Sequence, residues 1–132
     1  MELKAYEIIN INEVFNKIAQ ADVNIKTAIS VARNIKELET PIKLIQEKQK
    51  ALFDVYAEKD EEGNYIPGEV ENSIRITQPD EFRPKLQEIM DADIDVTLRK
   101  LKISDLEGVK LSANDIRILD TLLEDDEEST EA

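Results

Sequence analysis

The sequence of 132 residues contains no cysteine, no histidine and no tryptophan. Without cysteine it forms no disulfide framework and no thiolate metal site, and without histidine it has no imidazole base or metal ligand. Ser-His and Cys-His catalytic pairs are therefore excluded. The three glycines are too dispersed for the glycine-rich loops that hold phosphate groups. Carboxylates, serines, lysines and tyrosines remain for chemistry, but no pattern among them indicates an enzyme or a cofactor site.

Long apolar runs are absent as well. The longest is far shorter than the roughly 20 residues that span a bilayer, and the N-terminus lacks the pattern of a secretory signal. We therefore expect a cytoplasmic protein with no membrane contact. Hydrophobic residues make up 41% of the chain, which is enough for a packed core.

Positive charge is scarce in the second half of the chain. The protein has 30 acidic and 17 basic residues, and residues 58–132 carry the whole net charge of −13. A surface of this sign repels phosphate groups and anionic lipids, so direct binding to nucleic acid is not expected. The acidic half serves either solubility or contact with a basic partner.

Apolar residues at steps of three and four predict two helices in the first half, over residues 5–20 and 25–56. The second would be about 45–50 Å long. Its apolar stripe consists of Ile25, Ala28, Ile29, Ala32, Ile35, Leu38, Ile42, Ile45, Leu52 and Tyr56. Pro41 lies inside this helix and predicts a kink or a break, because proline removes a backbone donor. We expect the first helix to fold back on the second as an antiparallel hairpin.

Alternating apolar residues after the second helix predict a small antiparallel sheet of two or three strands. A charged loop at residues 58–64, with glycine and asparagine, ends the helical pattern. The predicted strands are residues 65–66, 70–77 and 93–99. The last is the clearest, because Ile94, Val96 and Leu98 all fall on one face.

Two short helices complete the predicted fold. Residues 79–90 place Phe82, Leu86 and Ile89 on one face. After a turn at residues 103–111, Ser112–Asp115 resembles the capping box that starts a helix. The residues expected to point inward from this last helix are Ile116, Leu119, Leu122 and Leu123.

The predicted fold class is α+β and mostly helical, with a helical hairpin, one long kinked helix, a small antiparallel sheet and two short helices. We expect a single domain over residues 1–123. Residues 124–132 contain six acids and no base, which predicts an acidic disordered tail.

Four stretches of the sequence resemble a family of small proteins encoded by bacteriophages and prophages of low-GC bacteria. They are KAYEIIN (residues 4–10), ALFDVY (51–56), EKDEEGNY (58–65) and DLEGVKLS (105–112), the last followed by a leucine-rich helix. The resemblance covers most of the chain and includes no catalytic signature. It implies a phage origin without a particular activity, and Pro41 departs from the family pattern of a straight second helix.

The acidic loop also has some spacing of a calcium loop. The matching positions are Asp60, Glu62, Asn64 and Glu71. Tyr65 stands where such a loop requires glycine, so we predict a solvated turn there.

Three aspartates, Asp91, Asp93 and Asp95, surround the start of the clearest predicted strand. Such carboxylates hold Mg²⁺ in some proteins. Charge that keeps an edge strand soluble is the simpler explanation, so no metal is predicted here.

We predict a non-catalytic, phage-encoded protein-interaction module without a cofactor. The long helix presents more apolar surface than a helix of half its length covers, so the sheet, a second copy or a host or phage protein covers the remainder. The predicted contact residues are Lys36, Lys43 and Lys50 on the long helix and Glu58, Asp60, Glu61 and Glu62 in the loop.

Two alternative functions fit the same composition. One is an accessory role in virion assembly or structure, in which case the chain associates with the virion as well as the host cytoplasm. The other is an acidic inhibitor, such as a DNA mimic, of a host defence or nucleic-acid-binding protein. The exposed lysines of the long helix argue against a mimic along that helix.

Overall fold

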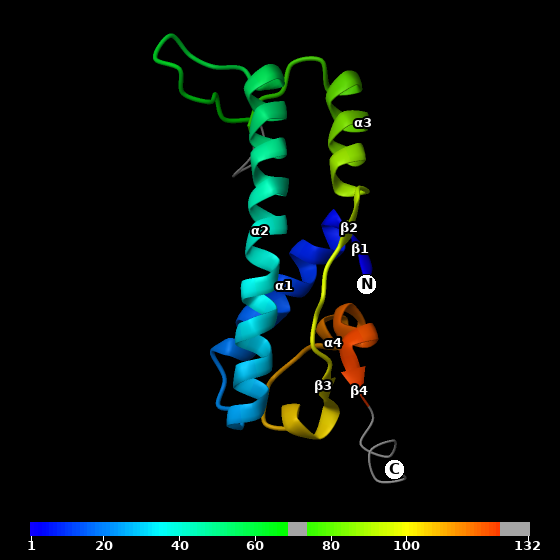
Figure 1. The fold of residues 1–132 in the computed structure, drawn as a ribbon. Coiled ribbons are helices and arrows are strands. Elements are labelled where there is room, and N and C mark those ends of the chain that lie inside the picture. The colour runs from blue at the N-terminus through cyan, green and yellow to red at the C-terminus, as the bar shows by residue number, and fades with distance from the viewer. Residues whose placement is uncertain (69–73, 125–132) are drawn as a thin grey trace. The chain divides into compact units, whose positions relative to one another are not determined.

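The computed structural model describes residues 1–68 and 74–124, and Figure 1 labels its elements. They are β1 (Glu2–Lys4), α1 (Ala5–Ala19), α2 (Ile25–Tyr56), α3 (Pro79–Met90), β2 (Asp93–Asp95), β3 (Leu101–Lys102), α4 (Ala113–Leu119) and β4 (Leu123–Glu124). Short 3-10 helices follow β3, at Ile103–Leu106, and α4, at Asp120–Leu122. The predicted α+β, mostly helical class is confirmed, with its hairpin of α1 and α2 and a small antiparallel sheet.

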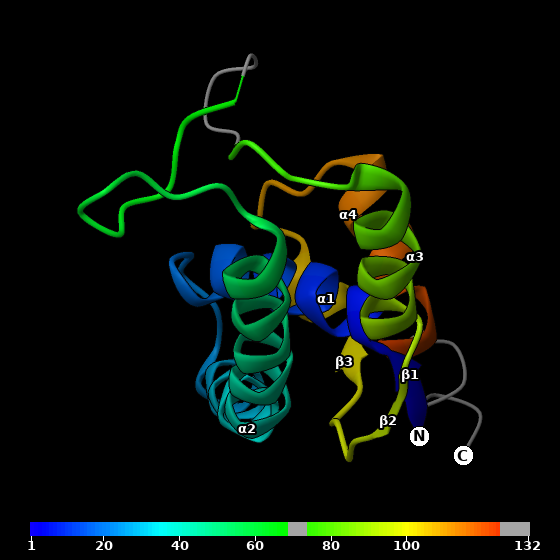
Figure 2. The same cartoon turned by 90° about the horizontal axis from the view of Figure 1, so that it is seen from above.

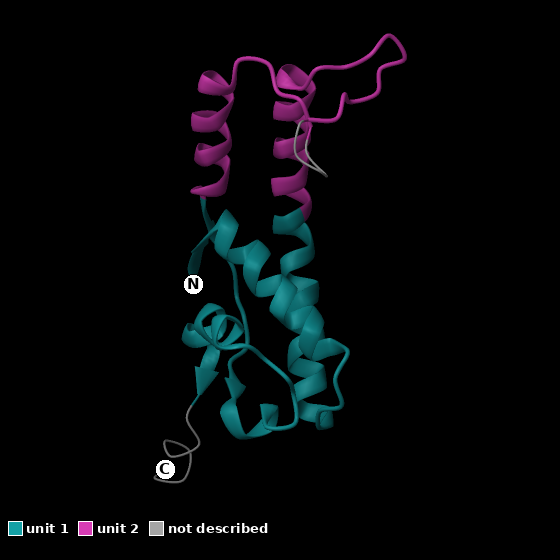
Figure 3. Ribbon diagram, turned by 180° about the vertical axis from the view of Figure 1, so that it is seen from behind, with its two compact units in different colours: residues 1–42, 93–132 teal, residues 43–92 magenta. Residues whose placement is uncertain are grey.

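The chain divides into two compact units, coloured separately in Figure 3. Unit 1 contains Met1–Ile42 and the described part of Asp93–Ala132, and unit 2 contains Lys43–Ala92. The boundary falls within α2, which continues through Pro41 as one helix. A break at the proline is therefore wrong, whereas the kink stays a prediction. The single domain over residues 1–123 also stays a prediction.

The core of unit 1 is built on α1. Figures 1 and 2 both show this helix between the first half of α2 and the pair of strands β1 and β2. Its almost fully buried residues follow the predicted steps of three and four: Ala5, Ile8, Ile11, Val14, Phe15 and Ile18. Helix α4 also packs against α1. One amphipathic helix thus supplies the surface on which the other elements of unit 1 assemble.

Strand β1 pairs antiparallel with β2, with Leu3 opposite Ile94. The predicted strand at 93–99 keeps its alternation of burial, but only its first three residues join the ladder. Strand β1 was not predicted, because three residues directly before a helix are too few for an alternating pattern. Strands β3 and β4 form a separate two-residue parallel pair.

The buried face of α2 in unit 1 differs from the predicted stripe. Leu38 is buried as predicted, but the other covered residues, Thr27, Val31 and Asn34, were not part of the stripe. The predicted residues Ile25, Ala28, Ile29 and Ala32 are exposed instead. Helical periodicity finds both faces, but it does not tell which of them the rest of the chain covers.

Asn34 gives the physical reason for this orientation of α2. Its side-chain amide donates a hydrogen bond to the Arg99 carbonyl at 2.9 Å and accepts one from the Arg99 N–H at 2.7 Å. A buried amide with both functions satisfied is compatible with a core position. The same pair of bonds holds the segment after β2 against α2.

Unit 2 is held together by aromatic contacts between the second half of α2 and α3. The Phe82 ring lies 5.3 Å from that of Phe53 and 6.0 Å from that of Tyr56, measured between centroids. Phe82 is buried, and Leu86 and Ile89 are half-buried on the same face, as predicted. Offset and edge-on geometries of this kind are the favourable ones for aromatic pairs.

The strands predicted at 65–66 and 70–77 are reduced to isolated bridges. These are Ala57 with Ile76, Lys59 with Tyr65, and Pro67 with Ile74, all antiparallel. Residues 69–73 of the second prediction lie outside the described residues. Among the described residues between α2 and α3, the pairing is limited to these bridges and adds no strand to the sheet.

The capping box at the start of α4 is confirmed. Ser112 Oγ accepts the Asp115 N–H at 3.0 Å, and Asp115 Oδ2 accepts the Ser112 N–H at 3.1 Å. The inward position of Ile116 is wrong, because its side chain is exposed, whereas Leu119 and Leu122 are fully buried. The α-helix ends at Leu119 and tightens into a 3-10 turn, which shifts the period of the buried residues.

The turn predicted at residues 103–111 begins with the 3-10 helix Ile103–Leu106. Of the predicted acidic tail, Glu124 belongs to β4, and residues 125–132 lie outside the described residues.

The hydrogen bonds of Asn34 lead to a stability prediction. We expect Asn34→Ala to lower the free energy of unfolding by about 2 kcal/mol, because it leaves two partly buried backbone groups of Arg99 without partners. Urea denaturation measures the change. Asn16→Ala is the matched control, since Asn16 is exposed on α1, and its effect should stay within about 0.5 kcal/mol. Equal effects of the two substitutions would contradict the role assigned to Asn34.

Candidate interaction surfaces

The acidic loop, defined as residues 58–62, has an ordered internal structure. Asp60 Oδ1 accepts the backbone N–H groups of Glu62 at 2.9 Å and Asn64 at 3.0 Å. Gly63 adopts a φ of 86°, which an L-residue with a side chain rarely takes. Glu58 pairs with Arg75 at 3.3 Å. Among the described residues, no hydrogen bond or ion pair involves the carboxylates of the other two predicted loop residues, Glu61 and Glu62.

The base of the loop is a small polar cluster at the end of α2. Asp54 accepts hydrogen bonds from the Tyr65 hydroxyl at 2.7 Å and from Lys59 Nζ at 3.3 Å. The bond from Tyr65 lowers the pKa of Asp54, and the Asp54 carboxylate raises the pKa of Tyr65. The cluster anchors the loop and keeps Asp54 ionised at neutral pH.

Metal binding finds no support in the described residues, which contain no group of three acidic side chains placed to hold an ion. In the loop, Asp60 already accepts two backbone donors, and Glu71 lies outside the described residues. At the sheet, Asp93 pairs with Lys4 at 3.7 Å, and Asp95 pairs with the N-terminal ammonium at 3.0 Å. In both places the carboxylates serve local structure.

Asp115 is the one charged residue buried in the described core, at 6% exposure. Lys17 Nζ of α1 lies 3.0 Å from both of its carboxylate oxygens. The backbone N–H of Ser112 and the Lys17 ammonium lower the pKa of Asp115. A carboxylate with a lowered pKa and engaged oxygens is a structural link between α1 and α4, not a general base for neutral pH.

The lowered pKa of Asp115 predicts a pH-dependent contribution to stability. In the unfolded chain an aspartate has a pKa of about 3.9. The stabilisation from ionised Asp115 is therefore complete above that pH, and it is lost as the pH falls toward the lower pKa of the folded state. We expect Asp115→Asn to destabilise the protein at pH 7 and the difference from wild type to shrink below about pH 4. Urea unfolding at pH 7 and pH 3 measures this difference. Asp22→Asn, at an exposed loop position, removes the same charge and should show no such trend.

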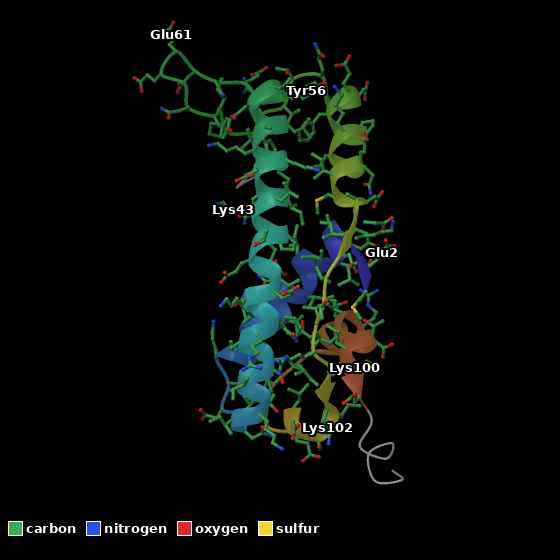
Figure 4. All side chains as sticks on the ribbon, viewed as in Figure 1. Glu2, Lys43, Tyr56, Glu61, Lys100 and Lys102 are labelled. Atoms are coloured by element: carbon green, nitrogen blue, oxygen red, sulfur yellow. The ribbon has the colours of Figure 1, made fainter. Side chains whose placement is uncertain are left out.

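The predicted lysines of the long helix are all exposed. Lys36 belongs to unit 1, whereas Lys43 and Lys50 belong to unit 2 together with the acidic loop. Figure 4 labels Lys43 on α2 and Glu61 at the tip of the loop. Only Lys36 lines one of the hollows described below.

An uncovered apolar face lies on the first half of α2, and we call its residues Ile25, Ala28, Ile29 and Ala32 the apolar surface. Ile25 is 75% exposed and Ile29 is 42% exposed. Ala28 and Ala32 also line a hollow of about 400 Å³, whose opposite wall is the end of α1 and the connection to α2. That wall is largely apolar as well, with Ala19, Ala21 and Val23.

Six basic residues line two neighbouring hollows of unit 1, of about 780 and 750 Å³. We call this set the basic track: Lys26, Arg33 and Lys36 from α2, and Arg99, Lys100 and Lys102 from the segment that leads into β3. The bonds between Asn34 and Arg99 hold its two sides together. Sequence reasoning missed the track, although residues 99–102 hold three of the nine bases of residues 58–132.

Comparison with known protein families, curated proteins and solved structures finds no match to this chain. Among the described helices, none has the length and apolar character that crossing a membrane requires.

Proposed function

We propose that this chain is a non-catalytic, phage-encoded module that binds a partner protein through the apolar surface of α2. The observation that carries the proposal is the exposure of Ile25 and Ile29 beside an apolar hollow on the part of α2 that belongs to unit 1. Covering an aliphatic side chain of this size contributes about 1.5–3 kcal/mol relative to leaving it in water. A partner that covers both side chains therefore gains a substantial part of its binding free energy from them.

The spacing of the apolar surface suits a helical partner. Its residues follow steps of three and four along α2, which is the pattern through which two helices pack side by side. The adjoining hollow between α1 and α2 would receive a side chain of that partner. The partner is thus a host or phage protein with an apolar helical stripe.

A second copy of the chain is a less suitable occupant of this surface. Lys26 and Arg33 flank the apolar residues on α2, so pairing two such faces would bring like charges together. The same bases would attract a partner of opposite charge. We therefore propose a complex with a different protein in the host cytoplasm. Its partner can be a virion component, which would give the chain an accessory role in assembly.

An acidic inhibitor that mimics DNA is less well supported. The acidic loop offers two uncommitted carboxylates, because Glu58 pairs with Arg75 and Asp60 bonds to the loop backbone. A groove that binds DNA contacts many phosphates along the duplex, so a mimic needs a longer series of free carboxylates.

Photo-cross-linking tests the proposed function. We expect p-benzoylphenylalanine at position 25 or 29 to form a discrete adduct with another protein in the infected host cell, whereas the same residue at Glu39, an exposed polar position of α2, should form none. Ile25→Asp should reduce the adduct formed from position 29 by about tenfold, because it places a charge in an apolar contact.

Two results of this experiment would overturn the proposal. Equal labelling from positions 29 and 39 would mean that the apolar surface selects no partner. An adduct between two copies of the chain would assign the surface to self-association.

A further inference from the structure

The bases of the basic track form no ion pair with a carboxylate of the described residues, as is also true of Lys43 and Lys50; what sets the track apart is that six bases line two hollows of one unit. Lys17, Lys59 and Arg75 each form an ion pair with an acid of the chain. In the described residues, no ion pair involves Lys26, Lys100 or Lys102, although the sequence has 30 acids for 17 bases. In a chain with such an excess of carboxylates, a group of bases without internal partners is available to an external one.

The geometry of the track suits an extended chain segment. Lys26 and Arg33 are seven residues apart on α2 and thus lie on the same side of the helix, and Lys36 follows one turn later. The helix rises about 15 Å from residue 26 to residue 36, which matches four or five residues of extended peptide. Figure 4 labels Lys100 and Lys102 on the segment opposite.

The lining of the first hollow combines lysines with apolar and acidic groups. Ile25 contributes exposed aliphatic surface and also belongs to the apolar surface, whereas Leu101 is almost fully buried beneath the hollow. Asp105 and Glu124 lie at the same hollow, and Asp105 accepts a hydrogen bond from Asn24 at 3.0 Å. Any anionic ligand meets these two carboxylates and the net charge of −13, but a phosphodiester backbone also offers no aliphatic group to the apolar part of the lining. A peptide that alternates carboxylates with apolar side chains fits this lining better.

We propose that the basic track binds a carboxylate-rich segment of a partner protein. This inference rests on the proposed function, since it names the chemistry of the partner that the apolar surface contacts. Lysines on both walls of the track pair with the carboxylates of an extended segment, and its apolar side chains contact the exposed Ile25.

Fluorescence anisotropy with the purified full-length chain tests this proposal. The probe is a fluorescein-labelled peptide of five glutamates alternating with leucines, and the matched control peptide carries glutamines in place of the glutamates. We expect the glutamate peptide to bind about tenfold more tightly at low salt, and we expect 0.5 M NaCl to remove most of this difference.

Charge-reversal variants locate the binding. Lys100→Glu combined with Lys102→Glu should weaken binding of the glutamate peptide about tenfold, because each change replaces an attraction by a repulsion. Lys43→Glu combined with Lys50→Glu makes the same change in net charge outside the track and should weaken it less than about twofold. Circular dichroism melting of both variants confirms that each is folded.

Four results would overturn the assignment. Equal binding of the two peptides, or equal effects of the two double variants, would show that the track does not select carboxylates. Tighter binding of a ten-nucleotide oligothymidylate would assign it to nucleic acid. In a further variant, the five acids of residues 125–131 are replaced by their amides. If this variant bound the peptide more tightly, the track would be assigned to the chain's own C-terminus. The peptide assay needs no natural partner, so its outcome is independent of the cross-links from positions 25 and 29. A failure of this inference is therefore distinguishable from a failure of the proposed function.

Discussion

The two hydrogen bonds between Asn34 and the backbone of Arg99 determine how unit 1 presents its surfaces. They make a polar position of α2 part of the buried face, and they fix a segment without regular structure against the helix. Since that segment carries Arg99, Lys100 and Lys102, the same bonds bring its bases to those of α2. A buried amide with both functions satisfied is stable only in this one arrangement, so it specifies the orientation of α2 as well as stabilising it.

Helix α2 has two apolar faces in unit 1. In the orientation that it adopts, the rest of the unit covers only one of them. Val31 and Leu38 are buried in unit 1, whereas Ile25 and Ile29 remain in water. A helix that is apolar on several sides is normally surrounded by protein. Single exposed aliphatic residues need no explanation, but a periodic set beside an apolar hollow indicates a contact surface. This periodic set is the structural basis of the binding surface proposed here.

Local signals in the sequence were sufficient to predict the helices. They were insufficient to predict the apolar surface and the basic track. The bounds of α2 and the capping box of Ser112 and Asp115 follow from periodicity and hydrogen-bonding chemistry within a few residues. The covered face of α2, the three-residue strand β1 and the basic track all depend on pairing between residues far apart in the chain. Asn34 looks like an ordinary exposed polar residue in the sequence, because its partner is the backbone of a residue 65 positions away. Of the predicted contact residues, Lys36 alone lines the track.

The net charge of the protein and the charge of the track act at different distances. Salt screens charges beyond about 8–10 Å, so a segment bound as proposed would respond mainly to the bases of the track and to the carboxylates at the same hollows. These are Asp105 and Glu124 at the first hollow and Glu37 and Asp95 at the second. An approaching acidic partner meets the net charge of −13 first, which slows association rather than strengthening it. In the proposed complex the track would select and align the partner, whereas burial of Ile25 and Ile29 would supply most of the affinity. Neither surface is sufficient alone, because the apolar one lacks selectivity and the charged one loses strength with salt.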